Sequence, residues 1–289
     1  MAMLCHHRSV CCSLLFGSLT VGCHAQDTER SPLVGDVRIV MYDPAETTIG
    51  LRFEPPAGFQ RTLTAPRSFA GYLRELPLKR HTAMVHLFDG RSKNRQDVHA
   101  AVIDMSVGTK DLQQCADAVM RLRAEYLFAA DRAHEISFNF TSGFKAPFSR
   151  WAKGERIRVM RNDCAWNSGG KAGATHEDLL NYLGMVFTYA GTASLSKELK
   201  DCSTSPVQSG DVFIQGGHPG HAVIVVDVAS DGNGGQVFLL AQSYMPAQEI
   251  HVLKNLEDPT LLPWFKLNDG AELVTPEWTF RWDQRKRWR

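Results

Sequence analysis

The fold is decided by residues 210–248, GDVFIQGGHPGHAVIVVDVASDGNGGQVFLLAQSYMPAQ. The pattern predicts a short strand, a glycine-rich bend carrying His218 and His221, and two longer apolar strands joined by the polar turn SDGNGG. Counting outward from this turn pairs residues 221–229 with residues 235–243. The stretch therefore predicts an antiparallel hairpin in which His221 opens the first strand.

Strand geometry limits which side chain can orient the His221 ring. Asp227 shares its strand face but lies six residues along, roughly 20 Å away at about 3.3 Å per residue, so it is too distant. The numbers of opposed residues sum to about 463 to 465, which puts Gln242, Ser243 or Tyr244 opposite His221. We choose Gln242, because its side-chain oxygen can accept the Nδ1–H of a neutral imidazole.

A helix is predicted over residues 111–128, DLQQCADAVMRLRAEYLF. Asp111 is a good N-cap residue, and Gln114 three positions later gives a close relative of the capping box. Cys115 then lies in the first turn, where unpaired backbone N–H groups and the helix dipole stabilise a thiolate. The same N–H groups, assisted by Gln114, are candidate donors to an oxyanion.

Cys115, His221 and Gln242 supply the nucleophile, base and orienting group of a cysteine amidase. Two plainer interpretations stay open: Cys115 is an inert buried thiol, and His221 only caps a strand. Because 106 positions separate the cysteine from the histidine, residues 147–201 are predicted to form an insertion between them. These residues belong to a single domain over residues 37–289.

A zinc site is a weaker alternative. His218, His221 and His251 are the candidate ligands, but no carboxylate or cysteine set completes a typical ligand spacing. Glycines 216, 217 and 220 lack a following helix, which argues against a phosphate-binding loop. We therefore predict no cofactor and no metal.

Two pieces of the chain carry a resemblance. QQCADAVMRLRAEYL, followed by residues 210–235 and LLAQSYMP, is similar to cysteine- and histidine-dependent amidohydrolase/peptidase (CHAP) domains and to NlpC-type peptidases. In those families a cysteine opens a helix, a histidine opens a strand after a Gly-Asp strand, and an acid or amide lies on the next strand. The resemblance implies an α+β fold with a papain-like core, and cleavage of peptide or peptidoglycan amide bonds.

From about residue 37 the chain resembles a bacterial exported family, domain of unknown function 4846. This resemblance is carried by DLQQCADAV, Arg-Trp at 150–151, YAGT at 189–192, PGHAVIVVD, AQSYMPAQ and TPEW at 275–278. The family name implies no activity. The alternative function is thus a non-catalytic envelope binding or assembly lipoprotein on an amidase-like scaffold.

Residues 1–25 are predicted to be a secretory signal. Their apolar part, residues 10–21, is too short to span a bilayer as a helix. Residues 19–23, LTVGC, resemble a loose lipobox that would leave Cys23 acylated, whereas Cys23-His24-Ala25 would serve an ordinary signal peptidase. We favour the lipoprotein, which places the protein in the periplasm or at the outer membrane, with membrane contact only through a lipid anchor.

Charge and cysteine content add two limits. The 32 Lys and Arg residues nearly balance the 31 Asp and Glu residues, which gives no electrostatic footprint for nucleic acid. Beyond the signal segment only Cys115, Cys164 and Cys202 remain, so at least one thiol is unpaired within the chain. A Cys164–Cys202 disulfide, leaving Cys115 free, is a hypothesis that the sequence cannot fix.

The remaining elements are expected on either side of the cysteine helix. A β-rich N-terminal extension supplies strands and one helix, and helices dominate the region before residue 210. The predicted strands are 37–42, 49–53, 83–88, 98–105, 136–140 and 156–160, and the further helices are 68–76, 175–189 and one starting at Ser194.

Overall fold

The protein is described by a computed structural model that covers residues 43–161, 163–266 and 272–289. These residues belong to one compact unit. The predicted signal segment 1–25 and the predicted strand 37–42 lie outside the described residues. Among the helices that are described, none has the length and apolarity to cross a bilayer.

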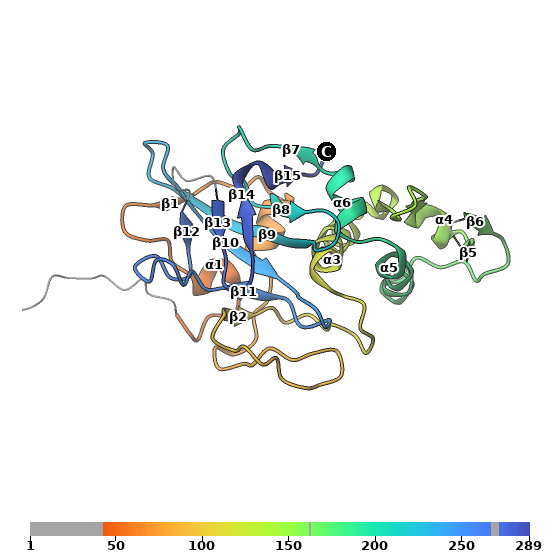
Figure 1. Cartoon of the computed structure of the whole chain (residues 1–289), viewed down its shortest axis with the longest axis horizontal. Helices are drawn as coiled ribbons and strands as arrows, with labels where there is room; N and C mark the ends of the chain where they lie inside the picture. The colour runs from red at the N-terminus through yellow and green to blue at the C-terminus, as the bar shows by residue number, and fades with distance from the viewer. Residues whose placement is uncertain (1–42, 162, 267–271) are drawn as a thin grey trace, which may run out of the picture. The chain divides into compact units, whose positions relative to one another are not determined.

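A nine-stranded sheet forms the centre of this unit, and all its strand pairs are antiparallel (Figure 1). β9 and β10 are its longest strands and lie beside each other in the middle. The strand order is β2 (His99–Val102), β11 (His251–Leu253), β10 (Gln236–Gln242), β9 (His221–Ser230), β8 (Val212–Gln215), β15 (Arg285–Arg287) and β7 (Lys200–Asp201), with β1 (Gln60–Arg61) on β9 and β12 (Phe265–Lys266) on β10.

The apolar run of β9 is buried on both faces of the sheet. Ala222, Ile224 and Val226 point into the larger core, which includes much of α3 (Cys115–Ala129). Val223 and Val225 point into a smaller core on the opposite face, closed by β14 (Thr279–Arg281) and the 3-10 turn η2 (Trp282–Gln284). Because alternate residues face opposite sides of a strand, a continuous apolar run is required here.

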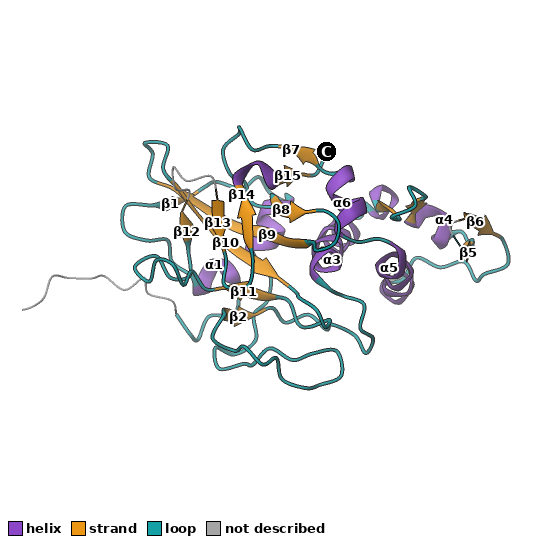
Figure 2. Cartoon of the chain, in the orientation of Figure 1, coloured by secondary structure: helices purple, strands orange, loops and turns teal. Residues whose placement is uncertain are grey.

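Helices and short hairpins flank the sheet, and most of them lie at its right-hand side in Figure 2. α3 packs directly on β9 and also contacts α2, α5 and α6. The other elements are α1 (Ile49–Arg52), α2 (Phe69–Arg74), η1 (Ala133–Glu135), α4 (Phe148–Ala152), α5 (His176–Tyr189), α6 (Thr192–Glu198), and the paired strands β3 (Ser137–Asn139) with β4 (Lys145–Pro147), β5 (Arg156–Met160) with β6 (Asp163–Asn167), and β13 (Glu272–Val274) with β14.

The predicted mixed helix-and-strand class with an antiparallel sheet is confirmed. The central hairpin, the strand at 156–160 and the helix capped by Thr175 are also confirmed. Thr175 accepts a hydrogen bond from the Asp178 N–H, and the Asp178 carboxylate accepts one from the Thr175 N–H, which together make a capping box.

The predicted β-rich N-terminal extension is wrong in part: β2 lies within the predicted strand 98–105, but two other predicted strands are not formed. Residues 49–53 begin a short helix instead of a strand, because the Thr48 hydroxyl accepts from the Leu51 N–H and caps it. Residues 83–88 form only the isolated bridges His86–Ser92 and Leu87–Gln248. A short apolar run does not distinguish a strand from a short helix or an isolated bridge, since packing against distant segments decides which one forms.

The hypothesised disulfide is also wrong: Cys115, Cys164 and Cys202 are free thiols. Cys164 lies on β6, with its sulfur 3.8 Å from the Ser142 hydroxyl. Cys202 follows β7 at the edge of the large sheet, where its carbonyl accepts from Arg285. Cys164 thus lies on β6, whereas Cys202 lies in the loop after β7, and the two have different contacts.

Candidate functional site

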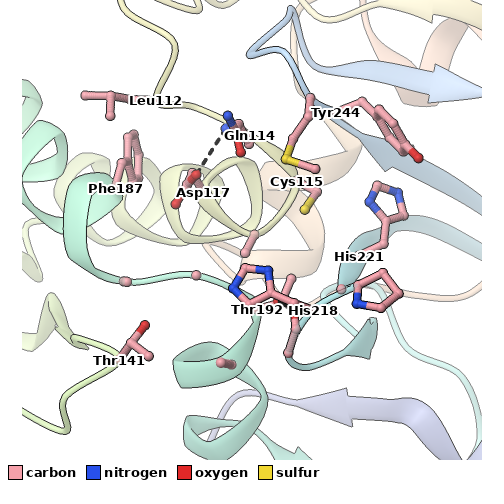
Figure 3. Close-up of a pocket in the computed structure, with 18 of the residues that line it drawn as sticks. Leu112, Gln114, Cys115, Asp117, Thr141, Phe187, Thr192, His218, His221 and Tyr244 are labelled. Atoms are coloured by element: carbon pink, nitrogen blue, oxygen red, sulfur yellow. Dashed lines mark hydrogen bonds between the residues drawn. The ribbon is translucent and has the colours of Figure 1, made fainter.

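A pocket of about 300 Å³ lies where α3 begins and β9 begins. Figure 3 shows Cys115 and His221 at this pocket, with Tyr244 above them and His218 on the facing loop. The structure therefore brings together at one cavity two segments that are 106 residues apart in the sequence. Gln114, just before α3, and Asp117, in its first turn, line the same cavity.

Cys115 is the first residue of α3, and the N-cap is Gln114 instead of the predicted Asp111. The helix starts three residues later than expected, because residues 111–112 form a turn. Asp117 supplies the cap, since its carboxylate accepts from the Gln114 N–H at 3.1 Å. The backbone N–H groups of Ala116 and Ala222 lie close enough to the sulfur to lower the pKa of the thiol. Since Ala222 directly follows His221, the thiol lies against the start of β9.

The expected stabilisation of a Cys115 thiolate is not found. The pKa of the Cys115 thiol is raised to about 11, mainly by burial and next by the nearby Asp117 carboxyl. The backbone N–H groups of the first turn act in the opposite direction but are outweighed. Desolvation disfavours the charged form, and with 8% of its surface exposed Cys115 is a neutral thiol at neutral pH.

His221 and Gln242 are brought together as predicted, but through the other ring nitrogen. The Gln242 side-chain oxygen lies 2.8 Å from Nε2 of His221, whereas Nδ1 was expected. β10 pairs with β9 so that Ala241 faces Ile224, after a shift at Leu239/Leu240. Continuing that register would put Tyr244 opposite His221, so Gln242 makes a diagonal contact, which a long side chain can span.

A chain of polar contacts fixes which end of the Gln242 amide faces the histidine. Lys93 pairs with the Glu277 carboxylate at 2.7 Å, and the other carboxylate oxygen of Glu277 lies 2.7 Å from the Gln242 amide nitrogen. An ionised carboxylate only accepts, so the amide NH₂ faces Glu277 and the amide oxygen faces His221. Nε2 of His221 must then carry the proton, which leaves Nδ1 unprotonated and able to accept one.

His251 supports the same orientation from the other side. Its Nδ1 donates to the Glu249 carbonyl at 2.9 Å, so its Nε2 is the acceptor for the Gln242 amide at 3.4 Å. With both ring nitrogens engaged and no exposed surface, His251 does not act as a metal ligand here. Within the described ranges no three His, Cys, Asp or Glu residues are grouped to hold a metal ion.

Aromatic side chains enclose the His221 ring. Its centroid lies 4.8 Å from that of Tyr244, 5.3 Å from Trp278 and 5.9 Å from Phe280. Burial lowers the pKa of His221 to about 4, and the Gln242 hydrogen bond opposes this only in part. At neutral pH the imidazole is therefore neutral, and no hydrogen bond joins it to the Cys115 thiol within the described part of the chain.

Gln114, the predicted assistant to an oxyanion, lines the pocket, and its amide nitrogen donates to the Asp111 carboxylate at 3.1 Å. Asp117 was not predicted. Burial raises the pKa of its carboxyl to about 8, so it is mostly protonated at neutral pH. Its second oxygen is buried without a partner among the described residues.

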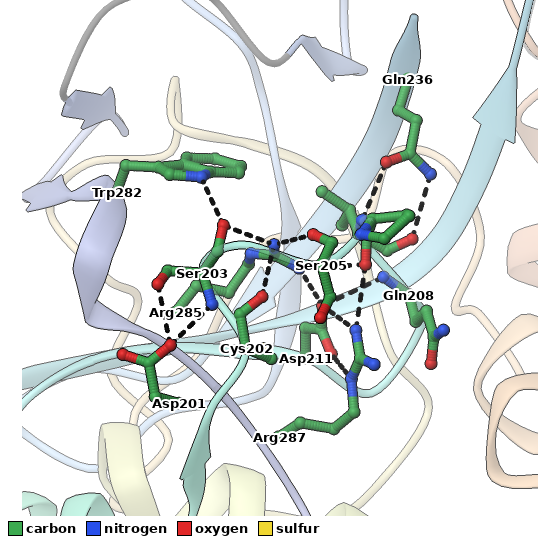
Figure 4. A network of polar contacts seen from close by, with 12 residues as sticks. Asp201, Cys202, Ser203, Ser205, Gln208, Asp211, Gln236, Trp282, Arg285 and Arg287 are labelled. Atoms are coloured by element: carbon green, nitrogen blue, oxygen red, sulfur yellow. Dashed lines mark hydrogen bonds and ion pairs between the residues drawn. The ribbon is translucent and has the colours of Figure 1, made fainter. Parts of the chain in front are cut away.

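Asp211, in the Gly-Asp pair before β8, has a structural position and does not face the pocket. Its carboxylate is fully buried and accepts from Arg285 and Arg287, both at 2.5 Å (Figure 4). Arg285 also donates to the Cys202 carbonyl at 2.8 Å. Asp211 therefore joins β8 and β15 to the loop after β7.

Sequence reasoning missed Lys93 and Glu277. Lys93 lies in the polar segment DGRSKNRQD, and Glu277 lies in the TPEW segment. The distances from Gln242 are 149 and 35 residues along the chain, and only the folded arrangement joins them. The TPEW segment was a signal for Glu277, but nothing in the local sequence distinguishes Lys93 from a solvated lysine.

Alkylation of Cys115 by iodoacetamide is expected to be slow at pH 7 and to rise about tenfold per pH unit up to the thiol pKa, because only the thiolate reacts. The thiolate fraction grows with pH since the folded pKa is about 11. Peptide mapping by mass spectrometry would separate Cys115 from Cys164 and Cys202. Rapid labelling of Cys115 at pH 7, equal to that of the unfolded chain, would contradict the buried neutral thiol.

Comparison with known proteins gives one match. The model of the family described as domain of unknown function 4846 matches residues 49–287, most of the chain. No curated protein and no solved structure shows significant similarity to the chain.

Proposed function

The chain belongs to the family described as domain of unknown function 4846, and from its site we propose that it is a cysteine amidohydrolase or peptidase. The proposal includes a papain-like core, in which α3 carries the nucleophile and β9 carries the base. Its substrates are amide bonds in peptides or in peptidoglycan of the cell envelope. The predicted export signal at residues 1–25 supports that location.

One observation carries the proposal: the polar chain from Lys93 through Glu277 and Gln242 holds His221 in one tautomer. That tautomer has its unprotonated Nδ1 available in a pocket that Cys115 also lines. A histidine that only capped a strand would not need a buried ion pair behind its amide partner. Orientation of a base by a third group is the arrangement that nucleophilic catalysis requires.

The reaction begins with a neutral Cys115 thiol and a neutral His221 imidazole. Nδ1 of His221 accepts the thiol proton while the Cys115 sulfur bonds to the amide carbon, and the carbonyl oxygen becomes an oxyanion. Backbone N–H groups at the start of α3, with the Gln114 amide assisting, hold that charge. His221 then gives the proton to the leaving nitrogen as the C–N bond breaks, which leaves a thioester on Cys115.

Hydrolysis of the thioester follows the same two steps, with water as the nucleophile in place of the Cys115 thiol. Nδ1 accepts a proton from water as its oxygen bonds to the thioester carbon, and the proton returns to the departing sulfur. The products are a carboxylic acid, an amine and the free thiol, with one water consumed. The Gln242 bond to Nε2 supports the imidazolium that forms transiently in each step.

The test is incubation of purified peptidoglycan sacculi with the wild type and with Cys115→Ala. Mass spectrometry of the soluble products should give fragments whose masses sum to the parent peptide plus one water, and only with the wild type. An identical product pattern for the two proteins would overturn the assignment of Cys115.

The raised pKa of Cys115 and the lowered pKa of His221 favour a second candidate function. In this case the protein is a non-catalytic envelope binding or assembly lipoprotein that uses the pocket for binding alone. Retained binding to sacculi without any new fragments from the wild type would favour this second function.

Replacing Glu277 with glutamine is expected to lower kcat by up to about 10⁴-fold, the loss found when a catalytic histidine is held in the wrong tautomer. The new amide can accept from Lys93 and donate to Gln242, so Gln242 turns its NH₂ toward His221. Nε2 must then accept, and the proton moves to Nδ1. Imidazole ¹⁵N chemical shifts of His221 would report the change of tautomer directly.

Glu249→Gln is the matched control for this substitution. Glu249 is also buried and pairs with Lys79, and its side chain lies outside the chain of contacts to His221. It should leave the His221 tautomer and kcat near their wild-type values. Equal losses from Glu277→Gln and Glu249→Gln would show that burial of an ion pair, not tautomer control, explains the effect.

A further inference from the structure

A second cavity, of about 560 Å³, lies beside the pocket that holds Cys115. Leu112 and Phe187 line both cavities and so form the wall between them. In Figure 3 these two side chains lie at the end of the first pocket away from His221. The second cavity continues from this wall along residues 106–113, α3 and α5.

Two residues that line the second cavity carry hydrogen-bond donors without partners. The amide nitrogen of Gln113 and the indole nitrogen of Trp151 are buried and make no hydrogen bond within the described ranges. Gln113 is 2% exposed and Trp151 is 7% exposed. A buried donor without a partner costs about 1–3 kcal/mol, so a ligand that accepts hydrogen bonds from these two donors would recover that energy.

Arg121, which forms an ion pair with Glu125, brings its guanidinium to the same cavity. Its Nε donates to Glu125 at 2.6 Å and its Nη1 donates to the Gln113 oxygen at 3.1 Å. Its Nη2 makes no hydrogen bond with the described residues. Lys110 is a second cation in the lining, which contains no Asp or Glu.

The side-chain amide of Gln113 has a fixed orientation. Because Arg121 only donates, the Gln113 oxygen must face it, and the amide nitrogen is left as the free donor. The free groups are thus all donors, from an amide, an indole and a guanidinium. A planar carboxylate matches such a set, since it offers two oxygens and only accepts.

We propose that the second cavity is a subsite that binds a carboxylate of the peptide substrate through Gln113, Trp151 and Arg121. This inference rests on the proposed amide hydrolysis at Cys115, because the shared wall of Leu112 and Phe187 places the subsite next to the bond that is cleaved. The substrate class is accordingly a peptide with a free carboxylate near its scissile amide. Amidated or esterified peptides bind more weakly.

Binding is tested on ¹⁵N-labelled Cys115→Ala protein, which cannot turn the probe over. The probes are N-acetyl-alanyl-alanine with a free C-terminal carboxylate and the same dipeptide with a C-terminal amide. The free acid should shift the Trp151 indole resonance and the Gln113 side-chain resonance, with at least about tenfold tighter binding than the amide, since a charged hydrogen bond contributes about 1.5–3 kcal/mol.

Gln113→Glu is the decisive variant, because it keeps an oxygen for Arg121 and replaces the free donor with a second, negatively charged oxygen. It should abolish the preference for the acid. Asn181→Asp, at an exposed position lining the same cavity, adds the same charge and should leave the preference in place. Loss of preference in both variants would point to charge alone and contradict the subsite.

Equal shifts with the acid and the amide would overturn the carboxylate assignment, and no shift with either probe would overturn the subsite. Failure of the proposed function gives a different result: selective binding of the acid without any turnover of sacculi by the wild type. Turnover of sacculi without selective binding of the acid would support amide hydrolysis and contradict the carboxylate subsite.

Discussion

Replacing Cys115, His221 or both with alanine is expected to lower kcat/KM for amide hydrolysis by a similar factor, about 10⁴-fold or more. The two side chains act in one proton transfer. Once either is removed, removal of the other should therefore cause little further loss of rate. The losses should therefore not add in the double variant. Steady-state release of peptide fragments from sacculi by the three variants measures this.

His218→Ala is the control for this comparison. His218 lines the same pocket but is exposed, three positions before His221. We expect kcat to stay near the wild-type value, because no polar chain orients its ring. Losses for Cys115→Ala and His221→Ala that multiply in the double variant would show that the two residues act independently.

Asp211→Ala is expected to lower the free energy of unfolding by about 3–5 kcal/mol, the cost of breaking a buried ion pair by removing one partner. The substitution leaves the guanidinium of Arg285, which has no exposed surface, without its carboxylate. Arg287 loses the same partner. Urea unfolding of the purified protein measures the change.

Asp201→Ala serves as the matched control on the adjoining strand. Its carboxylate is exposed and, among the residues that the structure describes, accepts hydrogen bonds from Ser203 alone. The change in unfolding free energy should stay within about 0.5 kcal/mol, as for most surface substitutions. Similar losses for Asp211→Ala and Asp201→Ala would contradict the structural role given to the buried carboxylate.

The central hairpin was predictable because its signals are local. An apolar run, the SDGNGG turn and a second apolar run occur in succession, so strand type and pairing follow from neighbours in the chain. The shift at Leu239/Leu240 was not predictable, because irregularities in a ladder leave no clear pattern in the sequence. That shift is why Gln242 meets His221 diagonally.

The sequence predicted that Cys115 and His221 line the candidate site, but it did not predict the ionisation state of Cys115. First-turn N–H groups favour a Cys115 thiolate, but the sequence does not show how deeply the helix start is buried. Likewise, exclusion of Asp227 was correct, and the structure gives the reason it is buried: it pairs with Arg61 and Arg74. Ion pairs between such distant segments come from tertiary packing.

The pH dependence of kcat/KM for sacculi hydrolysis tests the central claim most directly. The active form has a neutral His221, with a pKa of about 4, and a protonated Cys115, with a pKa of about 11. Activity should therefore be flat from about pH 5 to about pH 10, because kcat/KM reports the pKa values of the free enzyme. It should be absent from Cys115→Ala throughout. An acid limb near neutral pH, or no hydrolysis by the wild type at any pH in this range, would contradict the account.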